Sequence, residues 1–367
     1  MNTKTNDNQL NHNQSPHSFP VRLPAECENH DCVLLAWPHE ETDWAYMLDE
    51  ARECFANIVR AISARECVLL VGPKRLCNRS VKQYSFDPAR VRFIDVETND
   101  TWARDFGPIT VEKEGALHIL DFKFNAWGLK FPADKDNLIT THLALKGTFN
   151  ADYENRLGFV LEGGSIESDG HGTLLTTAEC LLSPNRNGGM NEEQIRAYLA
   201  DALGFTHQLW LRNGGMAGDD TDSHIDTLAR LAPHDTILYV GATDSDGNTV
   251  ESLSRMRDEL TDMRTAQGQP FNLIELPLPT PIYDEDGLQL PATYANYLVA
   301  DTAIYLPTYA QPANDLLAEQ TLKIAYPDHD IIPIDCRALI RQHGSLHCVT
   351  MQLPTGSVNG IRDGRWE

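Results

Sequence analysis

Short apolar runs alternate with longer amphipathic stretches from about Pro24 onward, and this alternation constrains the fold more than any other feature. Apolar runs bounded by Gly, Pro, Asn or Asp are typical of buried strands. We predict strands at Val33–Trp37, Val68–Val71, Val91–Val96, Leu117–Phe124, Phe159–Leu161, Leu174–Thr177, Gln208–Leu211, Thr236–Val240, Asn272–Leu276, Tyr297–Val299 and Ile331–Ile334. Because helical stretches fall between them and no Pro-, Gly- or Ser-rich linker interrupts the order, we predict a mixed α/β fold and a single domain over residues 21–367.

The clearest predicted helix runs from Trp44 to Ile62. Its apolar residues recur at helical spacing and form one stripe, which must pack against a sheet. The stripe consists of Leu48, Ala51, Phe55, Ile58, Val59 and Ile62. Further helices are predicted at Asn191–Leu203, after a turn at Pro184–Asn187, at Val250–Ala266 and at Asn314–Ile324.

Residues Met1 to Pro20 are polar and rich in Asn, Gln and His. This segment has no apolar core of an export signal, and no run in the chain approaches the length of a transmembrane span. We therefore expect a disordered tail over residues 1–20 and a cytoplasmic location. The eight cysteines are then expected to be free thiols, with Cys54, Cys67 and Cys336 in structural positions.

The chain carries 53 Asp and Glu residues against 30 Lys and Arg, a formal charge of −23. Such a surface repels nucleic acid and anionic membranes, and it attracts small cations toward any acidic cleft. We therefore expect neither nucleic acid nor membrane as a partner, while a homo-oligomer remains open. Solubility alone explains the charge as well as a cationic ligand does.

Cys348 is the cysteine whose neighbours are typical of an active-site edge. Gly344–Ser345 gives an adaptable approach, and Val349–Thr350 is expected to begin a strand, which places the thiol at an exposed junction. A nearby cation favours the attacking thiolate. His347 is adjacent, but neighbours on a strand point to opposite faces, so we expect another histidine to carry the proton. A lone cysteine is otherwise a small buried apolar residue.

His224 and Asp226 are two positions apart, so in an extended strand both side chains lie on one face and reach one ligand. Neighbouring acids raise the pKa of a histidine, which then transfers a proton near neutrality. The glycines at Gly214–Gly215 and Gly218 let the backbone approach a ligand. A hydrogen-bonded surface turn is the alternative reading of this motif.

Two further acids occur in distinctive settings. Asp105 lies in the run Trp102–Pro108, where a Gly–Pro turn constrains the loop, although an ion pair with Arg104 also explains the run. Glu162 follows an apolar strand and precedes two glycines, so it either orients an imidazole or caps a turn. The indoles of Trp37, Trp44 and Trp127 are expected in cleft loops covering a flat cation, and packing explains them nearly as well.

Together these residues supply a thiol, an imidazole and several carboxylates, the groups needed to attack a planar cation such as a guanidinium. The candidates recur at intervals of roughly 50 to 75 residues, as repeated modules around a centre would require. The residues concerned are Asp105, Glu162, His224, Asn296 and Cys348. Without internal sequence similarity, this spacing does not distinguish repeats from chance.

Several motifs occur in order between about Pro24 and about Pro354: Trp37–Pro38, Trp102–Pro108, Glu162–Ser165, Pro184–Asn187, Gly218–Thr221 with His224–Asp226, Tyr294–Asn296 and His347–Cys348. Together they resemble the agmatine deiminase and bacterial-type peptidylarginine deiminase family. The resemblance implies the pentein fold, a fivefold pseudosymmetric α/β propeller of ββαβ modules with its active site in the central channel. It also implies an enzyme that uses neither metal nor organic cofactor.

Motif matching implies a role for each candidate. Cys348 takes the position of the nucleophile, His224 that of the general acid and base, and Glu162 that of the acid supporting the histidine. The paired guanidinium clamps match Asp105 and Asp226. Further substrate contacts are expected from Asp220, Trp102, Trp127 and Asn296. The implied reaction is hydrolysis of a guanidino group through a covalent amidino-cysteine intermediate.

Agmatine is the expected substrate, because acidic residues near the site suit a second positive charge and disfavour a carboxylate. These residues are Asp219, Asp220, Glu40, Glu41 and Asp43. Peptidyl-arginine is the alternative, since two departures from the agmatine deiminase pattern affect the distal pocket. Leu129–Lys130 replaces a second glycine, and His343–Gly344–Ser345 replaces a glycine run.

Three other classes remain to be compared with this reading. A metal hydrolase could use His224 with Asp220, Asp222 and Asp226, although the chain lacks a second well-spaced ligand pair. A papain-like protease places its cysteine before its histidine, the reverse of the order found in this chain. A non-catalytic module that only binds a guanidino ligand would contain an unreactive Cys348.

Overall fold

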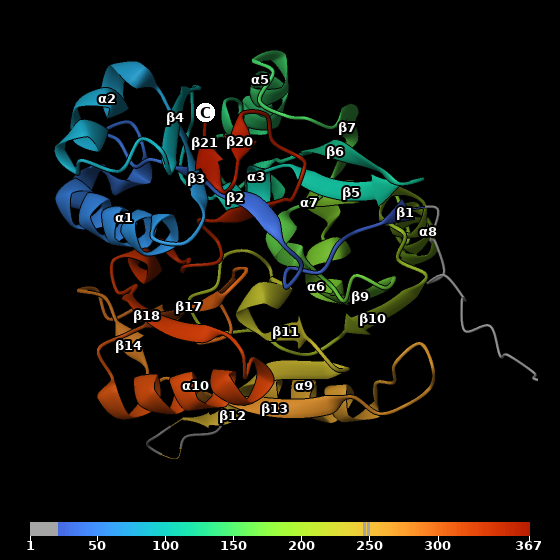
Figure 1. Cartoon of the computed structure of the whole chain (residues 1–367). Helices are drawn as coiled ribbons and strands as arrows, with labels where there is room; N and C mark the ends of the chain where they lie inside the picture. The colour runs from blue at the N-terminus through green and yellow to red at the C-terminus, as the bar shows by residue number, and fades with distance from the viewer. Residues whose placement is uncertain (1–20, 245–246, 248–249) are drawn as a thin grey trace, which may run out of the picture.

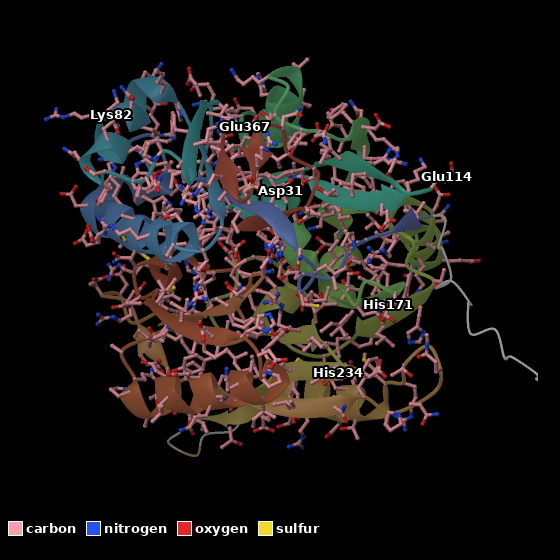
Figure 2. All side chains as sticks on the ribbon, viewed as in Figure 1. Asp31, Lys82, Glu114, His171, His234 and Glu367 are labelled. Carbon is pink, nitrogen blue, oxygen red and sulfur yellow. The ribbon has the colours of Figure 1, made fainter. Side chains whose placement is uncertain are left out.

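The computed structural model describes residues 21–244, 247 and 250–367, so the tail expected at residues 1–20 lies outside the described chain. Within the described part, five sheets of three or four strands surround a common centre, with most of the helices on the outside (Figure 1). Side chains fill the space between the sheets, whereas Lys82 and Glu114 extend from the rim (Figure 2). This arrangement is the α/β propeller that the motifs predicted.

The sheets follow the chain around the ring. The strands of the first two sheets are β19 (Met351–Pro354), β2 (His30–Ala36), β3 (Cys67–Gly72) and β4 (Val91–Asp95), then β1 (Val21–Arg22), β5 (Ile109–Lys113), β6 (Ala116–Lys123) and β7 (Asp152–Val160). The other three sheets contain β8 (Ile166–Ser168), β9 (Thr173–Thr177) and β10 (His207–Leu211), then β11 (Ala229–Ala232), β12 (Thr236–Asp244) and β13 (Asn272–Leu278), then β16 (Leu298–Val299), β17 (Ala303–Thr308) and β18 (Asp330–Asp335). Two hairpins are β14 (Ile282–Tyr283) with β15 (Gln289–Leu290) and β20 (Ile361–Arg362) with β21 (Arg365–Trp366).

One connection recurs in every sheet. An antiparallel pair is followed by a helical crossover to a parallel strand, as in β5, β6 and β7. The main crossover helices are α1 (Leu48–Ser63), α5 (Ile139–Leu145), α8 (Glu192–Leu203), α9 (Glu251–Asp262) and α10 (Pro312–Ala325). The shorter helices are α2 (Lys74–Gln83), α3 (Ala103–Phe106), α4 (Ala126–Leu129), α6 (Ala178–Leu181) and α7 (Pro184–Asn187). Parallel strands require such crossovers, because their ends lie at opposite edges of the sheet.

The first sheet is completed by the C-terminal part of the chain. β19 pairs antiparallel with β2, with Met351 opposite Leu34 and Leu353 opposite Cys32. This pairing supplies the first module with the strand that the other modules take from their own sequence, so it closes the ring. β19 begins at Met351 rather than at the predicted Val349–Thr350, and Cys348 therefore lies on a turn.

The predicted helices are present with shifted ends. The stripe of α1 is buried from Ala51 onward and Leu48 is half-buried, but a 3₁₀ turn at Asp43–Met47 replaces the predicted first turn. α8 begins at a capping box in which Asn191 and Gln194 exchange hydrogen bonds, and it ends at Gly204 with φ of 76°. α9 ends at Asp262, before the predicted Ala266, because Met263 has extended backbone angles.

All predicted strand runs overlap observed strands, but several strands were missed. The missed strands include β5, β8 and β11, which are the short first strands of their ββαβ modules, and the buried strand β17. Pro307 within β17 is a residue that usually argues against a central strand. All eight cysteines are free, and Cys54, Cys67 and Cys336 are buried as predicted. In the described ranges, we find no helix that is both long enough and apolar enough to span a membrane.

Candidate active site

One side chain from each sheet reaches the centre of the ring, as their mutual contacts show. Each comes from the segment that precedes the first strand of its ββαβ module: Asp105 before β5, Glu162 before β8, His224 before β11, Asn296 before β16 and Cys348 before β19. The regular intervals in the sequence therefore have a structural cause. Each ββαβ module contributes one buried functional group at the same position.

The thiol of Cys348 is 5% exposed and is surrounded by polar groups. Its Sγ lies 3.2 Å from Asn296 Nδ2 and 3.8 Å from Asp226 Oδ2. The backbone N–H of Cys348 donates to Asn296 Oδ1 at 3.3 Å, and the Cys348 carbonyl accepts from the backbone N–H of Arg104 at 3.1 Å. These contacts hold both the thiol and its backbone in place.

The two expected clamp residues converge beside Gly164. A Cβ atom on this glycine would lie 2.7 Å from His224 Nδ1, 2.8 Å from Asp105 Oδ1 and 3.1 Å from Asp226 Oδ2. These distances are too short for a side chain, so the motif requires glycine here. Three functional groups, Asp105 from the segment before β5 and both His224 and Asp226 from the segment before β11, therefore surround one small space.

The two carboxylates differ in how they are bonded. Asp105 accepts from the Gly164 N–H at 3.0 Å and from Trp127 Nε1 at 2.9 Å, so both of its oxygens are held. Asp226 Oδ2 accepts from Asn296 Nδ2 at 3.2 Å, but Asp226 Oδ1 is buried without a hydrogen-bond partner among the described residues. Leaving a buried carboxylate oxygen unpaired is costly. The site therefore presents an acceptor for a donor that the chain itself does not supply.

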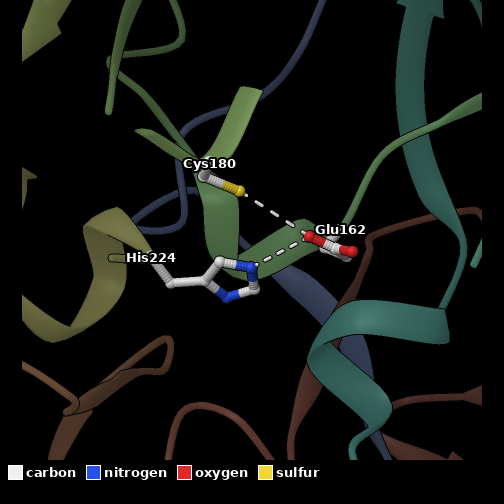
Figure 3. A group of neighbouring side chains, drawn as sticks. All are labelled: Glu162, Cys180 and His224. Atoms are coloured by element: carbon white, nitrogen blue, oxygen red, sulfur yellow. Dashed lines mark hydrogen bonds and ion pairs between the residues drawn. The ribbon is translucent and has the colours of Figure 1, made fainter. Parts of the chain in front are cut away.

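Glu162 and Arg186 support the imidazole from behind. His224 Nε2 lies 3.0 Å from Glu162 Oε2, and Arg186 Nε donates to the same oxygen at 2.8 Å. The Cys180 thiol also points to this carboxylate, with Sγ 3.7 Å from Glu162 Oε2 (Figure 3). His224 Nδ1 faces the opposite way, 3.7 Å from Asp105 Oδ1. The ring is therefore oriented with one nitrogen toward the central space.

Burial and charge set the ionisation of the site. Burial, followed by the charges of Asp226 and Asp105, raises the pKa of the Cys348 thiol well above its usual value, so the thiol of the free protein is neutral. Burial alone would lower the pKa of His224, but Asp105, Cys180 and Glu162 outweigh it and raise this pKa well above the ordinary value. The imidazole is therefore protonated at neutral pH.

A cavity of about 140 Å³ leads to the thiol. Trp102 and Trp127 form part of its wall, together with Phe124 and Phe131. Trp102 packs directly on Gly344, where an added Cβ would lie 2.1 Å from the indole ring. The glycine before the cysteine is therefore needed to seat this indole. Trp37 and Trp44 were expected over the cation but are fully buried in the core, where they contact Phe55, so that expectation was wrong.

The cavity wall is acidic. Of the expected residues, Asp220, Glu41 and Asp43 line it. The other two are absent from the described lining, because Glu40 bonds Arg52 and Asp219 accepts hydrogen bonds from its own loop. Sequence reasoning missed Asp100 and Asp136, which also line the cavity. Burial and the nearby charge of Asp43 raise the pKa of Asp100 to about 7.

The expectation that His224 and Asp226 share a strand face was wrong. His224 precedes a 3₁₀ turn at Ile225–Thr227, and Asp226 lies within it. The His224 N–H donates to Thr221 Oγ1 at 3.1 Å, and Thr227 Oγ1 donates to the His224 carbonyl at 2.8 Å. The motif is thus a hydrogen-bonded turn, but a buried one. The tight turn, rather than strand alternation, directs both side chains to the centre.

Asp222, a ligand in the metal-hydrolase alternative, is fully engaged in ion pairs. Its Oδ1 accepts from Lys130 Nζ at 2.7 Å, and its Oδ2 accepts from Arg186 Nη1 at 2.5 Å. Two cations beside these oxygens oppose the binding of a third, which argues against the proposed ligand set. Lys130 also donates to the Asp220 carbonyl, and His343 Nδ1 lies 2.7 Å from the Gly218 carbonyl. Lys130 and His343, which lie in the two segments that depart from the family pattern, therefore hold the loop of Gly218 and Asp220 beside the cavity.

Several functional positions were missed because their partners are distant in sequence. Glu26 and Arg230 lie beside His347 in a buried charged network, and Arg186 supports Glu162. Arg186 lies within the quoted Pro184–Asn187 motif, so that motif was an available signal. Glu26 had no such signal, since it follows the polar tail without a recognisable pattern.

Five ββαβ modules around a central site define a pentein-type α/β propeller. The model of the Porphyromonas-type peptidyl-arginine deiminase family matches residues 22–354, and the chain belongs to this family. An arginine deiminase from Porphyromonas gingivalis, named provisionally, is 45% identical and covers 92% of this chain and 100% of its own, with a TM-score of 0.86. The agmatine deiminase of C. jejuni with substrate bound is 37% identical and covers 93% of this chain and 97% of its own, with a TM-score of 0.84. A provisionally named agmatine deiminase of Mycoplasma mycoides is 33% identical, and the match covers 94% of this chain and 98% of the relative.

Proposed function

We propose that this protein hydrolyses the guanidino group of agmatine, giving N-carbamoylputrescine and ammonia. One observation carries the proposal: the Asp226 carboxylate lies in one buried cluster with Asp105, His224 and the Cys348 thiol, and its Oδ1 has no hydrogen-bond partner among the described residues. A guanidinium supplies N–H donors to both carboxylates, including the donor that Asp226 lacks, and paired bonds fix its plane. The similarity to the C. jejuni agmatine deiminase supports the same reading.

In the proposed mechanism, the bound guanidinium neutralises the two carboxylates that disfavour the thiolate, so the Cys348 proton leaves to solvent. The thiolate adds to the central carbon of the guanidinium. His224 then donates its proton to the departing nitrogen, which leaves as ammonia, and a cationic amidino-thioether remains. Glu162 keeps the imidazole oriented during this transfer.

The second half of the proposed reaction reverses the role of His224. The neutral imidazole takes a proton from water, and the hydroxide adds to the same carbon. Collapse of this adduct breaks the carbon–sulfur bond and forms the carbonyl of the ureido product. The proton of the former hydroxyl returns to the thiolate, which restores the thiol and the imidazolium. Atoms and charge balance, with one proton released for each ammonia.

The distal carboxyls favour agmatine over free arginine. Asp43 and Asp100 lie close enough for their charges to interact, and the raised pKa of Asp100 results from burial and from Asp43. A second positive charge on the ligand relieves this repulsion, whereas a carboxylate increases it. Peptidyl-arginine is the second candidate, because the matching family model carries that name and a solved structure provisionally named a peptidyl-arginine deiminase is 43% identical to this chain.

The substrate is tested by incubating the purified protein separately with agmatine, free arginine and an arginine-containing peptide. We expect ammonia and a ureido product from agmatine, with turnover of arginine at least about tenfold lower because of the unfavourable carboxylate. Turnover of the peptide without turnover of agmatine would overturn the substrate assignment. Absence of ammonia from all three would contradict the proposed reaction and favour the binding module.

We expect kcat/KM for agmatine to fall as the pH is lowered through about 6. Burial raises the pKa of Asp105 to about 6, with further contributions from neighbouring acids. Protonation removes the negative charge and turns one acceptor oxygen into a donor, so below this pH activity is lost by about tenfold per pH unit. Initial rates at sub-saturating agmatine measure this limb, and a profile that is flat through pH 6 contradicts it.

We also propose that residues 21–367 form one catalytic domain in the cytoplasm. The pairing of β19 with β2 supports this unit, because the segment carrying Cys348 also completes the first sheet. The eight free thiols support a reducing compartment. Secretion with formation of disulfides would contradict the second part of this proposal.

A further inference from the structure

His347 is fully buried between two carboxylates on opposite sides of its ring. Nδ1 lies 2.8 Å from Asp226 Oδ2, and Nε2 lies 2.7 Å from Glu26 Oε1. Arg230 Nη2, a donor, also lies 3.1 Å from His347 Nε2, farther than the Glu26 oxygen. A carboxylate oxygen can only accept, so each carboxylate contact is a hydrogen bond only when the facing ring nitrogen carries a proton. The ring links the buried acid of the site to an acid near the start of the described chain.

Glu26 is itself held by cationic and polar groups. Its carboxylate accepts from Arg104 Nη1 at 2.9 Å, from Arg230 Nη2 at 2.7 Å and from Gln352 Nε2 at 3.1 Å. Arg230 in turn donates to the carbonyls of Ala295 and Tyr297, which precede β16. The segments preceding β5 and β16 and the strands β11 and β19 therefore fix the position of Glu26.

The charges of this buried network alternate. Arg104 and Arg230 are the cations, Glu26, Glu167 and Asp226 are the anions, and His347 lies between Glu26 and Asp226. Removing one member of a buried pair leaves an uncompensated charge, so the network resists rearrangement. Asp226 is its endpoint, and the Cys348 thiol lies beyond it, 3.8 Å from Asp226 Oδ2.

His347 does not replace His224 as the proton carrier. Both ring nitrogens of His347 are directed to carboxylates, so neither is available to a leaving group. His224 instead has Nδ1 in the central space beside Gly164. The two histidines therefore have different environments, although each contacts two acids.

We infer that His347, protonated on both ring nitrogens and held by Glu26, is a positioning residue that keeps the Asp226 carboxylate ionised and fixed beside the guanidinium. This inference rests on the proposed guanidine hydrolysis. Asp226 faces His347, Asn296 and Cys348 directly, and the charges of His224 and Arg230 also act on it. Burial alone would raise the pKa of Asp226, and His347 is first among the groups that lower it instead.

Three variants separate charge from packing. His347→Asn keeps a neutral donor toward Asp226, His347→Ala removes the donor, and Glu26→Gln keeps the shape of Glu26 but not its charge. Glu28→Gln is the matched control, because Glu28 lies in the same segment and pairs with Arg22 instead. Thermal unfolding verifies that each variant is folded, and Glu26→Gln is the variant least likely to perturb packing because it is isosteric.

The pH dependence of kcat/KM distinguishes a positioning role from a structural one. In the parent protein the acid limb is expected to follow Asp105 with a slope of about one. Both His347 variants should make Asp226 titrate in the same range, which moves the limb to higher pH and steepens it toward a slope of about two. We expect the largest change in His347→Ala, smaller changes in His347→Asn and Glu26→Gln, and none in Glu28→Gln.

A second measurement does not depend on any substrate. Nitrogen NMR of histidine-labelled protein reports whether both nitrogens of His347 carry protons, and the His347→Asn spectrum identifies the signals. We expect an imidazolium in the free protein. A neutral ring, or variants whose kcat/KM falls while the acid limb keeps its position and slope, would overturn the inference. If the parent protein released no ammonia from any guanidino compound, the proposed function would fail, and the NMR signals would still decide the charge of His347.

Discussion

Cys348→Ala is expected to lower ammonia release from agmatine by at least about 10⁴-fold, because no other group replaces the thiolate that bonds to the guanidinium carbon. The Cys348 thiol lies in the buried cluster with Asn296 and Asp226, whereas Cys180 is directed to Glu162. Steady-state assays of ammonia and ureido product measure the loss. Calorimetric titration should still detect agmatine binding, since both clamp carboxylates remain.

Cys54→Ala is the matched control for this experiment. Cys54 is also a buried thiol, but it lies on α1 and contacts the carbonyl of Asp335. Its removal should change stability and leave turnover per folded molecule close to that of the parent. Undiminished turnover by Cys348→Ala would refute covalent catalysis through this residue. A protein that binds agmatine but never forms product, even with Cys348 intact, would instead be a binding module.

Asp226→Asn is expected to lower kcat/KM by about 10²- to 10³-fold, equal to about 3 to 4 kcal/mol of lost transition-state stabilisation. The substitution removes the charge that faces the guanidinium, and an amide group presents N–H donors where acceptors are required. It also leaves the buried His347 imidazolium facing a neutral amide instead of a carboxylate. Rates at sub-saturating agmatine, together with binding to the doubly substituted Cys348→Ala, Asp226→Asn protein, measure the effect.

Asp121→Asn provides the comparison for Asp226→Asn. Asp121 is a similarly buried carboxylate on β6, where it accepts from Thr141 Oγ1 at 2.5 Å and Tyr153 Oη at 2.7 Å. We expect this substitution to affect unfolding but not kcat/KM. Equal losses of kcat/KM in both variants would mean that buried aspartates matter here only for stability, and the clamp assignment would be wrong.

Much of the element order could be predicted from local pattern. The apolar stripe of α1 has the helical period that determines which face is buried. The continuous apolar run of β3 indicates a strand that is buried on both faces. The prediction failed at short strands such as β8, where three residues carry too little pattern. It also failed at His224, because a tight turn with left-handed backbone at Asp222 and Ser223 replaced the expected strand.

Candidate site residues could be identified only where a motif marked them. Cys348, His224 and Glu162 lie in recognisable runs, but the same kind of reasoning also selected Trp37 and Trp44, which are core residues. An indole in a polar loop has the same sequence signature whether it packs inward or lines a cavity. Burial depends on contacts between distant segments, so no local pattern could separate these cases.

The sequence alone determined the chemistry that this chain can bring to a ligand: a thiol four residues after a glycine, an imidazole beside acids, and a succession of strands and helices at nearly regular intervals. Tertiary structure alone decided which groups meet. Glu26 and His347 are 321 positions apart, yet ring closure brings their charged atoms within 2.7 Å. Ionisation depends on these long-range neighbours, because the same carboxylate or imidazole titrates differently when it is buried beside another charge.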